Sequence, residues 1–116
     1  MNIKKFTVKE TGVSIKVEIA DNFIKRFMGL MGRNNIGSAQ GLFLASCNSI
    51  HMCFMKFAID VIYVDKNFKI KKITHNLKPW TGVSMCFGAF GVIEVTAGDA
   101  KKFDFSVGQM FNVSMN

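Results

Sequence analysis

Short runs of apolar and β-branched residues recur along this chain, and they constrain its fold more than any other feature. The clearest run is the segment 13–19, in which Val13, Ile15, Val17 and Ile19 alternate with Ser14, Lys16 and Glu18. Alternation with a period of two places one set of side chains on each face of a strand. No run approaches the ~18 apolar residues of a membrane-spanning helix. The pattern predicts a mostly β domain in which this strand has one solvent-facing side.

Further runs of the same kind mark the other expected strands. They lie at residues 3–8, 41–46, 50–55, 59–64, 68–74, 92–96 and 109–114. The tripeptide Asp65-Lys66-Asn67 predicts a short hairpin turn, because Asp and Asn side chains bond to turn backbone. Residues 75–90 contain Pro79 and show no steady period, so we expect a long irregular segment there. Segments of this length in compact domains are often functional.

Helix is expected in two places. Asp21 is a suitable N-cap, and apolar residues recur after it at helical spacing, which predicts one main helix over about residues 22–31. A second, short helical turn is expected over about residues 98–103. The length indicates a single domain, residues 1–116. The expected fold is therefore α+β and mostly β, a small barrel-like sheet of mixed or antiparallel strands with one main helix against it.

The chain is basic, with a formal net charge of +7. Thirteen of its fifteen cationic side chains are lysines, and the one local cluster runs from Lys66 to Lys78. Lys69 and Lys71 lie two residues apart, which places both on the outer face of a strand. Lysine at such a position also opposes edge-to-edge aggregation. We therefore expect a solvated edge rather than a phosphate-binding stripe, and no nucleic-acid partner.

Cys47, Cys53 and Cys86 are odd in number and form no C-x-x-C pair. Free thiols in a reducing compartment explain them most simply. The apolar stretch that a signal peptide needs is broken near the N-terminus by Lys9 and Lys16. The sequence therefore predicts a soluble cytoplasmic protein, and we favour a monomer.

A polar and sulfur-rich segment, from His51 to Asp60, interrupts the apolar pattern at its centre. On a strand, His51, Cys53 and Met55 would share one face, and such soft donors would suit Cu(I). Packing of the two sulfur side chains, with a hydrogen bond to His51, explains the same spacing. Because the chain has no H-E-x-x-H, paired C-x-x-C or EF-hand pattern, we expect no metal site and no cofactor.

Asp60 requires an explanation, since strands disfavour aspartate. Its structural role would be to accept hydrogen bonds from buried loop N–H groups, or to pair with Arg26 or Lys56. Its functional role would be as an acceptor in a polar pocket beside His51. In an enzyme, His51 would act as the general base and Asp60 would orient it. No motif such as G-x-S-x-G marks a nucleophile.

Arg26 and Arg33 are the only arginines in this lysine-rich chain. A planar guanidinium forms two parallel hydrogen bonds to a carboxylate or phosphate, which an ammonium does poorly. We favour ion pairs inside the protein, in which Asp60 or Glu94 accepts from an arginine. Arg33 and Glu94 are the candidate residues for such structural pairs. An anionic group on a ligand is the alternative. Trp80, in the irregular segment, is either a lid over the core or a flat surface for a ligand.

Several blocks of the chain resemble the signature of the uncharacterised family called domain of unknown function 192. They are Arg26–Arg33, Gly41-Leu42-Phe43, Ser49–Asp60, Asn76–Trp80, Gly88-Ala89 and Val92-Ile93-Glu94, and they fall in the family's order. The resemblance covers the chain from about residue 20 to residue 114. Three positions depart from the usual pattern: Ala58 replaces a proline, Cys53 an aromatic residue and Gln109 an aspartate.

The resemblance implies a compact β-rich fold with a peripheral helix, and it implies no activity. Our leading hypothesis is non-catalytic recognition of a small or extended ligand, in a pocket near His51 and Asp60. The candidate ligand-binding residues are Arg26, His51, Met55, Asp60 and Trp80. The first alternative is a hydrolytic or metal-assisted enzyme that uses His51 and Asp60. The second is a protein-interaction module that uses the basic strand around Lys69 and Lys71.

Overall fold

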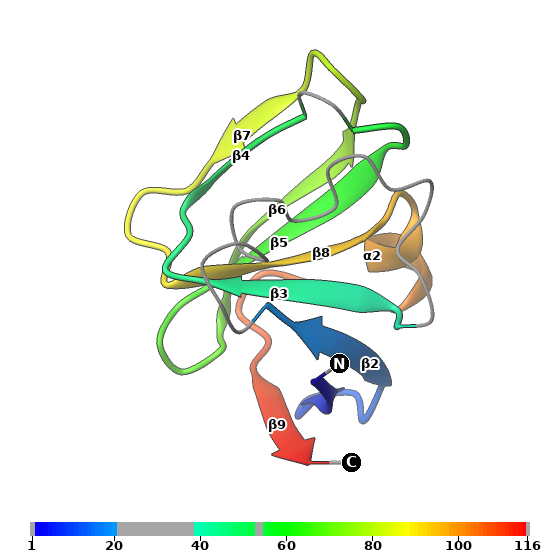
Figure 1. The fold of residues 1–116 in the computed structure, drawn as a ribbon. Helices are drawn as coiled ribbons and strands as arrows, with labels where there is room; N and C mark the ends of the chain where they lie inside the picture. The colour runs from blue at the N-terminus through cyan, green and yellow to red at the C-terminus, as the bar shows by residue number, and fades with distance from the viewer. Residues whose placement is uncertain (1, 21–38, 53–54, 116) are drawn as a thin grey trace.

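The computed structural model describes residues 2–20, 39–52 and 55–115, and these residues form a mostly β structure. Its elements in chain order are β1 (Ile3–Val8), β2 (Ser14–Ile19), β3 (Gly41–Ala45), β4 (Ser49–His51), β5 (Ile59–Val64), β6 (Ile70–Leu77), β7 (Val83–Met85), β8 (Gly91–Thr96), α2 (Asp99–Lys102) and β9 (Phe111–Met115). In the described part of the chain α2 is the one α-helix, so the structure has very little helix (Figure 1). The main helix expected over residues 22–31 lies outside the described residues.

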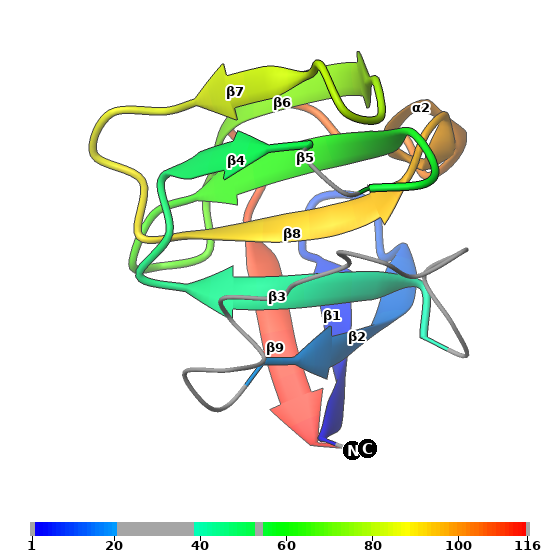
Figure 2. The same cartoon turned by 45° about the horizontal axis from the view of Figure 1, so that its top comes forward.

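Seven strands form one curled sheet, in the order β6-β5-β8-β3-β2-β1-β9 (Figure 2). Neighbouring strands are antiparallel except β2 and β3, which run parallel. The curl brings the two ends of the sheet together, because Lys69 beside β6 bridges to Met110 beside β9. The Ile70 N–H also donates to the Gln109 carbonyl, at 2.8 Å. The result is a half-barrel of mixed strands, in agreement with the mostly β fold that the sequence predicts.

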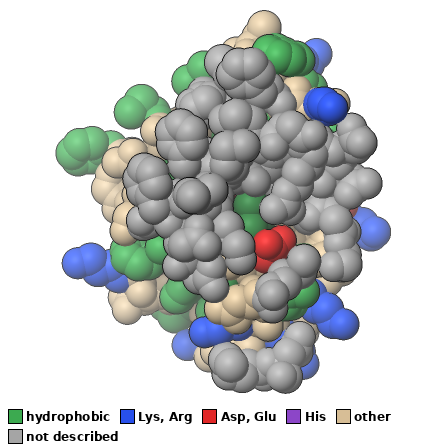
Figure 3. Space-filling view, viewed as in Figure 1, with side chains coloured by type: hydrophobic (Ala, Val, Ile, Leu, Met, Phe, Trp, Pro, Cys, Tyr) green, Lys and Arg blue, Asp and Glu red, His purple; other side chains and the backbone are tan. Residues whose placement is uncertain are grey.

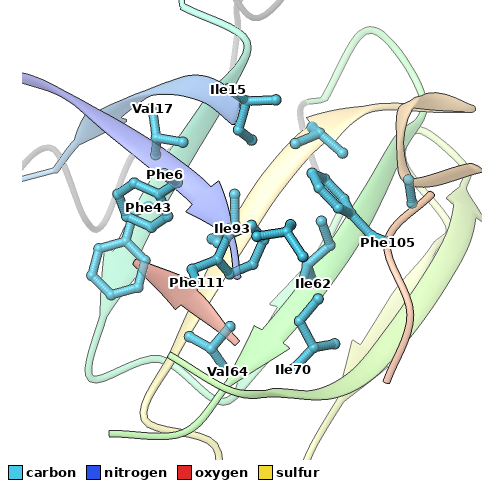
Figure 4. Packing of buried hydrophobic residues seen from close by; sticks show 13 residues of the cluster. Phe6, Ile15, Val17, Phe43, Ile62, Val64, Ile70, Ile93, Phe105 and Phe111 are labelled. Carbon is cyan, nitrogen blue, oxygen red and sulfur yellow. The ribbon is translucent and has the colours of Figure 1, made fainter. Parts of the chain in front are cut away.

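The concave face of the half-barrel encloses the larger core cluster (Figure 4). Its buried members are Phe6, Val8, Ile15, Val17, Phe43, Ile62, Val64, Ile70, Ile93, Val95, Ala100, Phe105 and Phe111. The alternation in β2 follows the prediction at Ile15 and Val17, which are buried, and at Lys16, which is exposed. Glu18 departs from it, because this side chain is 6% exposed on the face that we expected to be solvated. The outer face of β2, which we expected to be in contact with solvent, is therefore buried at Glu18.

A second core cluster lies on the outer face of β3, β5 and β8. Its buried members are Ala20, Leu42, Leu44, Ile50, Met52, Met55, Ile59, Val61, Tyr63, Leu77 and Val92. All six residues of β5 are buried because one cluster packs on each of its faces. A strand enclosed on both sides has no solvated face, which explains the nearly continuous apolar run at 59–64.

β4 and β7 form a separate antiparallel ribbon over this outer cluster, with Ile50 of β4 packed into it (Figures 1 and 2). The ribbon corrects two sequence predictions. The strand expected at 50–55 begins at Ser49 and ends at His51, and residues 75–90 are not uniformly irregular. They contain the end of β6 and all of β7, because β7 obtains its pairing from β4, which is distant in the sequence.

Candidate functional site

Asp60 is fully buried in β5, on the same face as Ile62 and the inner core. Its Oδ1 accepts a hydrogen bond from the Asn76 N–H at 2.8 Å. Its Oδ2 accepts from the N–H groups of Gly98 and Ala100, each at 3.0 Å. Hydrogen bonds to a carboxylate are among the stronger ones in proteins. The carboxylate therefore acts as an acceptor for loop N–H groups, which is one of the structural roles left open by the sequence.

The local backbone explains why these three N–H groups need a side-chain acceptor. The pairing of β5 with β6 shifts register opposite Asp60, and Asn76 in that irregularity adopts a φ of 53°. Gly98 and Ala100 lie at the start of α2, where the first N–H groups have no acceptor within the helix. One side chain thus ties together a central strand, a β-bulge and a helix start.

A cavity of about 260 Å³ lies beside this carboxylate and is lined by Asp60, His75, Asn76, Gly98 and Lys101. The histidine of this cavity is His75, which the sequence analysis did not select. His51, expected beside Asp60, lies in β4 with its backbone paired to Val83. The ribbon packs on the outer face of β5, whereas the Asp60 carboxylate lies on the inner face. The arrangement favours the structural role of Asp60.

The other candidate residues lie apart from this cavity. Met55 is 4% exposed in the outer cluster, and Glu94 is 4% exposed in β8. Trp80 is 57% exposed in the turn before β7, with a φ of 68°. Arg26 and Arg33 lie outside the described residues, so their ion pairs stay predictions.

The ribbon carries an exposed row of hydrophobic side chains. Val83 and Met85 lie at alternate positions of β7 and Phe87 lies in the turn that follows, and their exposed fractions are 74%, 59% and 93%. We call Val83, Met85 and Phe87 the apolar row, and Trp80 precedes it in the chain. In the space-filling view, hydrophobic side chains project from the edge of the molecule where Figure 1 places β7 and the following loop (Figure 3). Several exposed hydrophobic side chains gathered at one edge are typical of interaction sites.

Two lysines of β6 lie beside the apolar row. The Lys72 ammonium donates a hydrogen bond to the Met85 carbonyl oxygen at 2.7 Å. The Lys71 Nζ lies close to Gly88, since a Cβ built on that glycine would be 3.4 Å away from it. The exposed surface of the ribbon is therefore hydrophobic along its row and positively charged beside it.

The inward residue of β7 is polar, although its ladder partner Ile50 in β4 is apolar and packs into the outer cluster. In β7 this inverts the usual pattern of a surface strand. Ser84 is buried, and its hydroxyl accepts a hydrogen bond from the Tyr63 hydroxyl at 3.0 Å. The Ser84 and Thr74 hydroxyls are also hydrogen-bonded, at 2.6 Å. This network joins β5, β6 and β7. Sequence reasoning missed Tyr63 and Ser84, because the alternation in β7 covers only Val83, Ser84 and Met85 and has its polar residue on the buried side.

Burial raises the pKa values of two side chains, Tyr63 and Cys47. Desolvation raises the pKa of the Tyr63 phenol, and the hydrogen bond with Ser84 partly opposes the rise. Desolvation also raises the pKa of the Cys47 thiol above its ordinary value, with a smaller contribution from the Glu94 carboxylate. Both groups therefore favour their neutral forms in the fold.

The Tyr63→Phe variant should be less stable than the wild type by about 1 kcal/mol at pH 7, because one buried hydrogen bond is lost while Ser84 keeps Thr74 as a partner. The raised phenol pKa gives a second expectation. An unfolded tyrosine ionises near pH 10, so its contribution to wild-type stability is complete below that pH and declines as the pH rises further.

Urea unfolding of both proteins between pH 7 and about 10.5 measures this decline. Tyr63 is the only tyrosine, so the pH dependence that the variant loses belongs to this phenol. Parallel pH profiles for the two proteins would contradict the assignment.

No group of three or more His, Cys, Asp or Glu side chains in ranges 2–20, 39–52 and 55–115 is arranged to hold a metal ion. No helix in the part of the chain that the structure describes is long and apolar enough to cross a membrane.

Comparison with known proteins places the chain in a family. Residues 5–113 match DUF192, a family described as "Uncharacterized ACR". The chain belongs to the DUF192 family. The match confirms the resemblance seen in the sequence blocks, and the family's description assigns no activity to its members.

Several relatives are UPF0127 proteins of archaea. The protein of Pyrococcus abyssi is 40% identical over 98 residues, which cover 80% of this chain and 81% of that protein. The protein of Pyrococcus furiosus is 42% identical over 71 residues, which cover 59% of this chain. The matches to the relatives from P. furiosus, Thermococcus sibiricus and Pyrococcus horikoshii span 60%, 56% and 58% of those proteins. The chain therefore spans less than two thirds of their length.

Two solved structures share the fold. A protein of unknown function from Novosphingobium aromaticivorans superposes with a TM-score of 0.81 and 21% identity, over 95% of this chain and 84% of that one. A protein from Sinorhizobium meliloti, described as a candidate transcription regulator, gives a TM-score of 0.81 and 19% identity, over 97% and 92% of the two chains. At these identities the likeness shows the fold alone.

Proposed function

We propose that this DUF192 domain is a non-catalytic recognition module that binds an extended polypeptide segment along the β4–β7 ribbon. The observation that carries the proposal is the apolar row. Val83 and Met85, on one side of β7, and Phe87, in the turn after it, have exposed fractions between 59% and 93%. Hydrophobic side chains at alternate positions of an exposed strand match the spacing of side chains in an extended peptide.

Charge indicates which peptides would fit. Lys71 and Lys72 lie beside the row, and the whole chain carries a net charge of +7. A segment with apolar residues at alternate positions and acidic residues between or beside them would complement both features. Binding should therefore weaken as salt concentration rises, because the charged contacts are at the surface. Trp80, beside the row in the chain, offers the kind of aromatic anchor that peptide-binding surfaces often use.

The probe for a test is a phage-displayed library of random linear 12-residue peptides, selected on the purified full chain. We expect enriched peptides in which apolar residues alternate and Asp or Glu are frequent. Phe87→Ser and Met85→Ser should each weaken binding of the enriched peptides by about tenfold, the loss typical of a truncated interface anchor. Both variants should unfold at the wild-type temperature, because the two side chains are already exposed.

The matched control is Val107→Ser. Val107 is 64% exposed and lies outside the ribbon, so this change should leave peptide binding unchanged. Equal affinity of the enriched peptides for the wild type, Phe87→Ser and Met85→Ser would overturn the proposal. Selection of peptides with no shared apolar and acidic pattern would overturn it as well.

A further inference from the structure

A pair of lysines lies on β1 and β2, in the part of the half-barrel where Figure 2 shows β2, β1 and β9 side by side. Lys5 of β1 and Lys16 of β2 are direct partners in the antiparallel ladder, and both are exposed. Direct partners in such a ladder project from the same face of the sheet. Two like charges placed in this way destabilise a sheet. The pair therefore costs stability in the free protein, and a bound anion would relieve that cost.

A cavity of about 280 Å³ lies at this pair and is lined by Lys5, Ser14, Ile15, Lys16 and Gln40. Ligand sites in proteins begin near about 300 Å³, so the space suits a small ionic group with a short attached fragment. The described residues that line the cavity include two lysines and no Asp or Glu. Both charged side chains in this lining are therefore cationic, and the acidic residue of the same face of β2, Glu18, is buried two residues beyond Lys16.

The neutral side chains around the two lysines keep donors that the following two hydrogen bonds do not use. The Gln40 Oε1 accepts the Lys16 N–H at 2.8 Å, which leaves the amide N–H₂ group of Gln40 as its remaining donor. The Thr7 and Ser14 hydroxyls are hydrogen-bonded at 2.7 Å, so one of the two hydroxyl protons remains to be donated elsewhere.

We propose that this cavity binds the phosphate group of a small phosphorylated molecule, held between the ammonium groups of Lys5 and Lys16. A phosphate has several acceptor oxygens and a charge of about −1.5 to −2 near neutral pH, which matches two ammonium donors, an amide and a hydroxyl. Lysine binds phosphate as a point charge and requires no planar geometry. The site is separate from the β4–β7 ribbon, so its test does not depend on the proposed peptide recognition.

The probe is inorganic phosphate, titrated into the ¹⁵N-labelled full chain while chloride keeps the ionic strength constant. We expect the amide signals of Lys5, Ser14, Lys16 and Gln40 to shift with one common dissociation constant. Lys16→Gln and Lys5→Gln should each raise that constant by about tenfold, since each removes a charge-assisted hydrogen bond. Without phosphate, either variant should melt at or above the wild-type temperature, because the repulsion between the two lysines is removed.

Lys69→Gln is the matched control, because Lys69 is an exposed lysine outside the cavity. It should leave the dissociation constant unchanged. Phosphate shifts distributed over all lysine-bearing surfaces, or equal weakening by Lys69→Gln, would overturn the proposal. Sulfate in place of phosphate should produce shifts at the same amides, whereas acetate should bind at least tenfold more weakly. Equal binding of acetate would overturn the assignment to a phosphate group.

Discussion

Replacing Asp60 with alanine should lower the free energy of unfolding by about 3–5 kcal/mol. The substitution removes the acceptor of three backbone N–H groups, those of Asn76, Gly98 and Ala100. A buried donor that loses its partner costs about 1–3 kcal/mol, and access of water to part of this site reduces the sum. Domains of this size are commonly stable by only about 5–15 kcal/mol. The variant would therefore be close to the limit of folding.

The Asp60→Asn variant tests the same explanation in a protein that folds more readily. Its side chain keeps one oxygen acceptor but presents an N–H₂ group where the carboxylate accepts hydrogen bonds, so we expect a loss of about 2 kcal/mol. Urea unfolding measures the loss, and hydrogen exchange should accelerate at the Asn76, Gly98 and Ala100 amides in particular.

Asp65→Asn is the control for this effect. Asp65 also accepts two backbone hydrogen bonds, from Asn67 at 2.8 Å and from Lys69 at 3.0 Å, but in an exposed turn. Water can replace these bonds there, so the loss should stay below about 1 kcal/mol. Equal destabilisation by Asp60→Asn and Asp65→Asn would show that burial of the Asp60 carboxylate does not determine its contribution.

Gly91→Ala should lower the free energy of unfolding by about 2–3 kcal/mol, at the upper end of the usual cost of overpacking. Gly91 is buried at the start of β8, between Ala45 of β3 and Val64 of β5. An added Cβ would lie 2.8 Å from the Leu44 carbonyl oxygen and 2.8 Å from a carbon of the Phe43 ring. The ring can turn away, but the carbonyl is part of the β3 backbone, so the strands themselves must separate.

Gly41→Ala is the graded control, because Gly41 lies in the same β3–β8 ladder. The nearest atoms to its added Cβ are side-chain carbons of Ile93 and Val95, both at 3.2 Å, which can shift by a few tenths of an ångström, and the Glu94 carbonyl oxygen follows at 3.3 Å, 0.5 Å farther than the carbonyl oxygen at Gly91. We expect a loss of less than about 1.5 kcal/mol, and unfolding in urea compares the two variants. A larger loss at Gly41 than at Gly91 would contradict the steric argument.

The strands that depend on local pattern could be predicted from the sequence. The alternation at 13–19 corresponds to β2, and the apolar run at 59–64 corresponds to β5 residue for residue. The hairpin turn at Asp65 is also present, with its carboxylate bonded to the Asn67 N–H. These elements were predictable because neighbouring residues in the chain carry the signal.

β7 was not predicted because its polarity is inverted. Val83 and Met85 face solvent and Ser84 faces the core, so apolar residues do not mark the buried side. The pairing with β4 is also non-local, and no local pattern in the segment 75–90 identifies it. The residues of the proposed peptide-binding surface were also only partly predictable. Trp80 could be selected from the sequence because it is a large aromatic residue, but the apolar row that follows it could not.

The sequence by itself determined that the chain is a small, mostly β, lysine-rich domain of the DUF192 family, because composition, periodicity and motif blocks are properties of residues near one another in the chain. Only the tertiary structure decided the roles of particular polar groups. The Asp60 carboxylate accepts hydrogen bonds from the N–H groups of residues that lie 16, 38 and 40 positions away. The register of β1 and β2 places Lys5 opposite Lys16. Contacts between distant segments depend on how the whole sheet curls and pairs, which no short window of sequence contains.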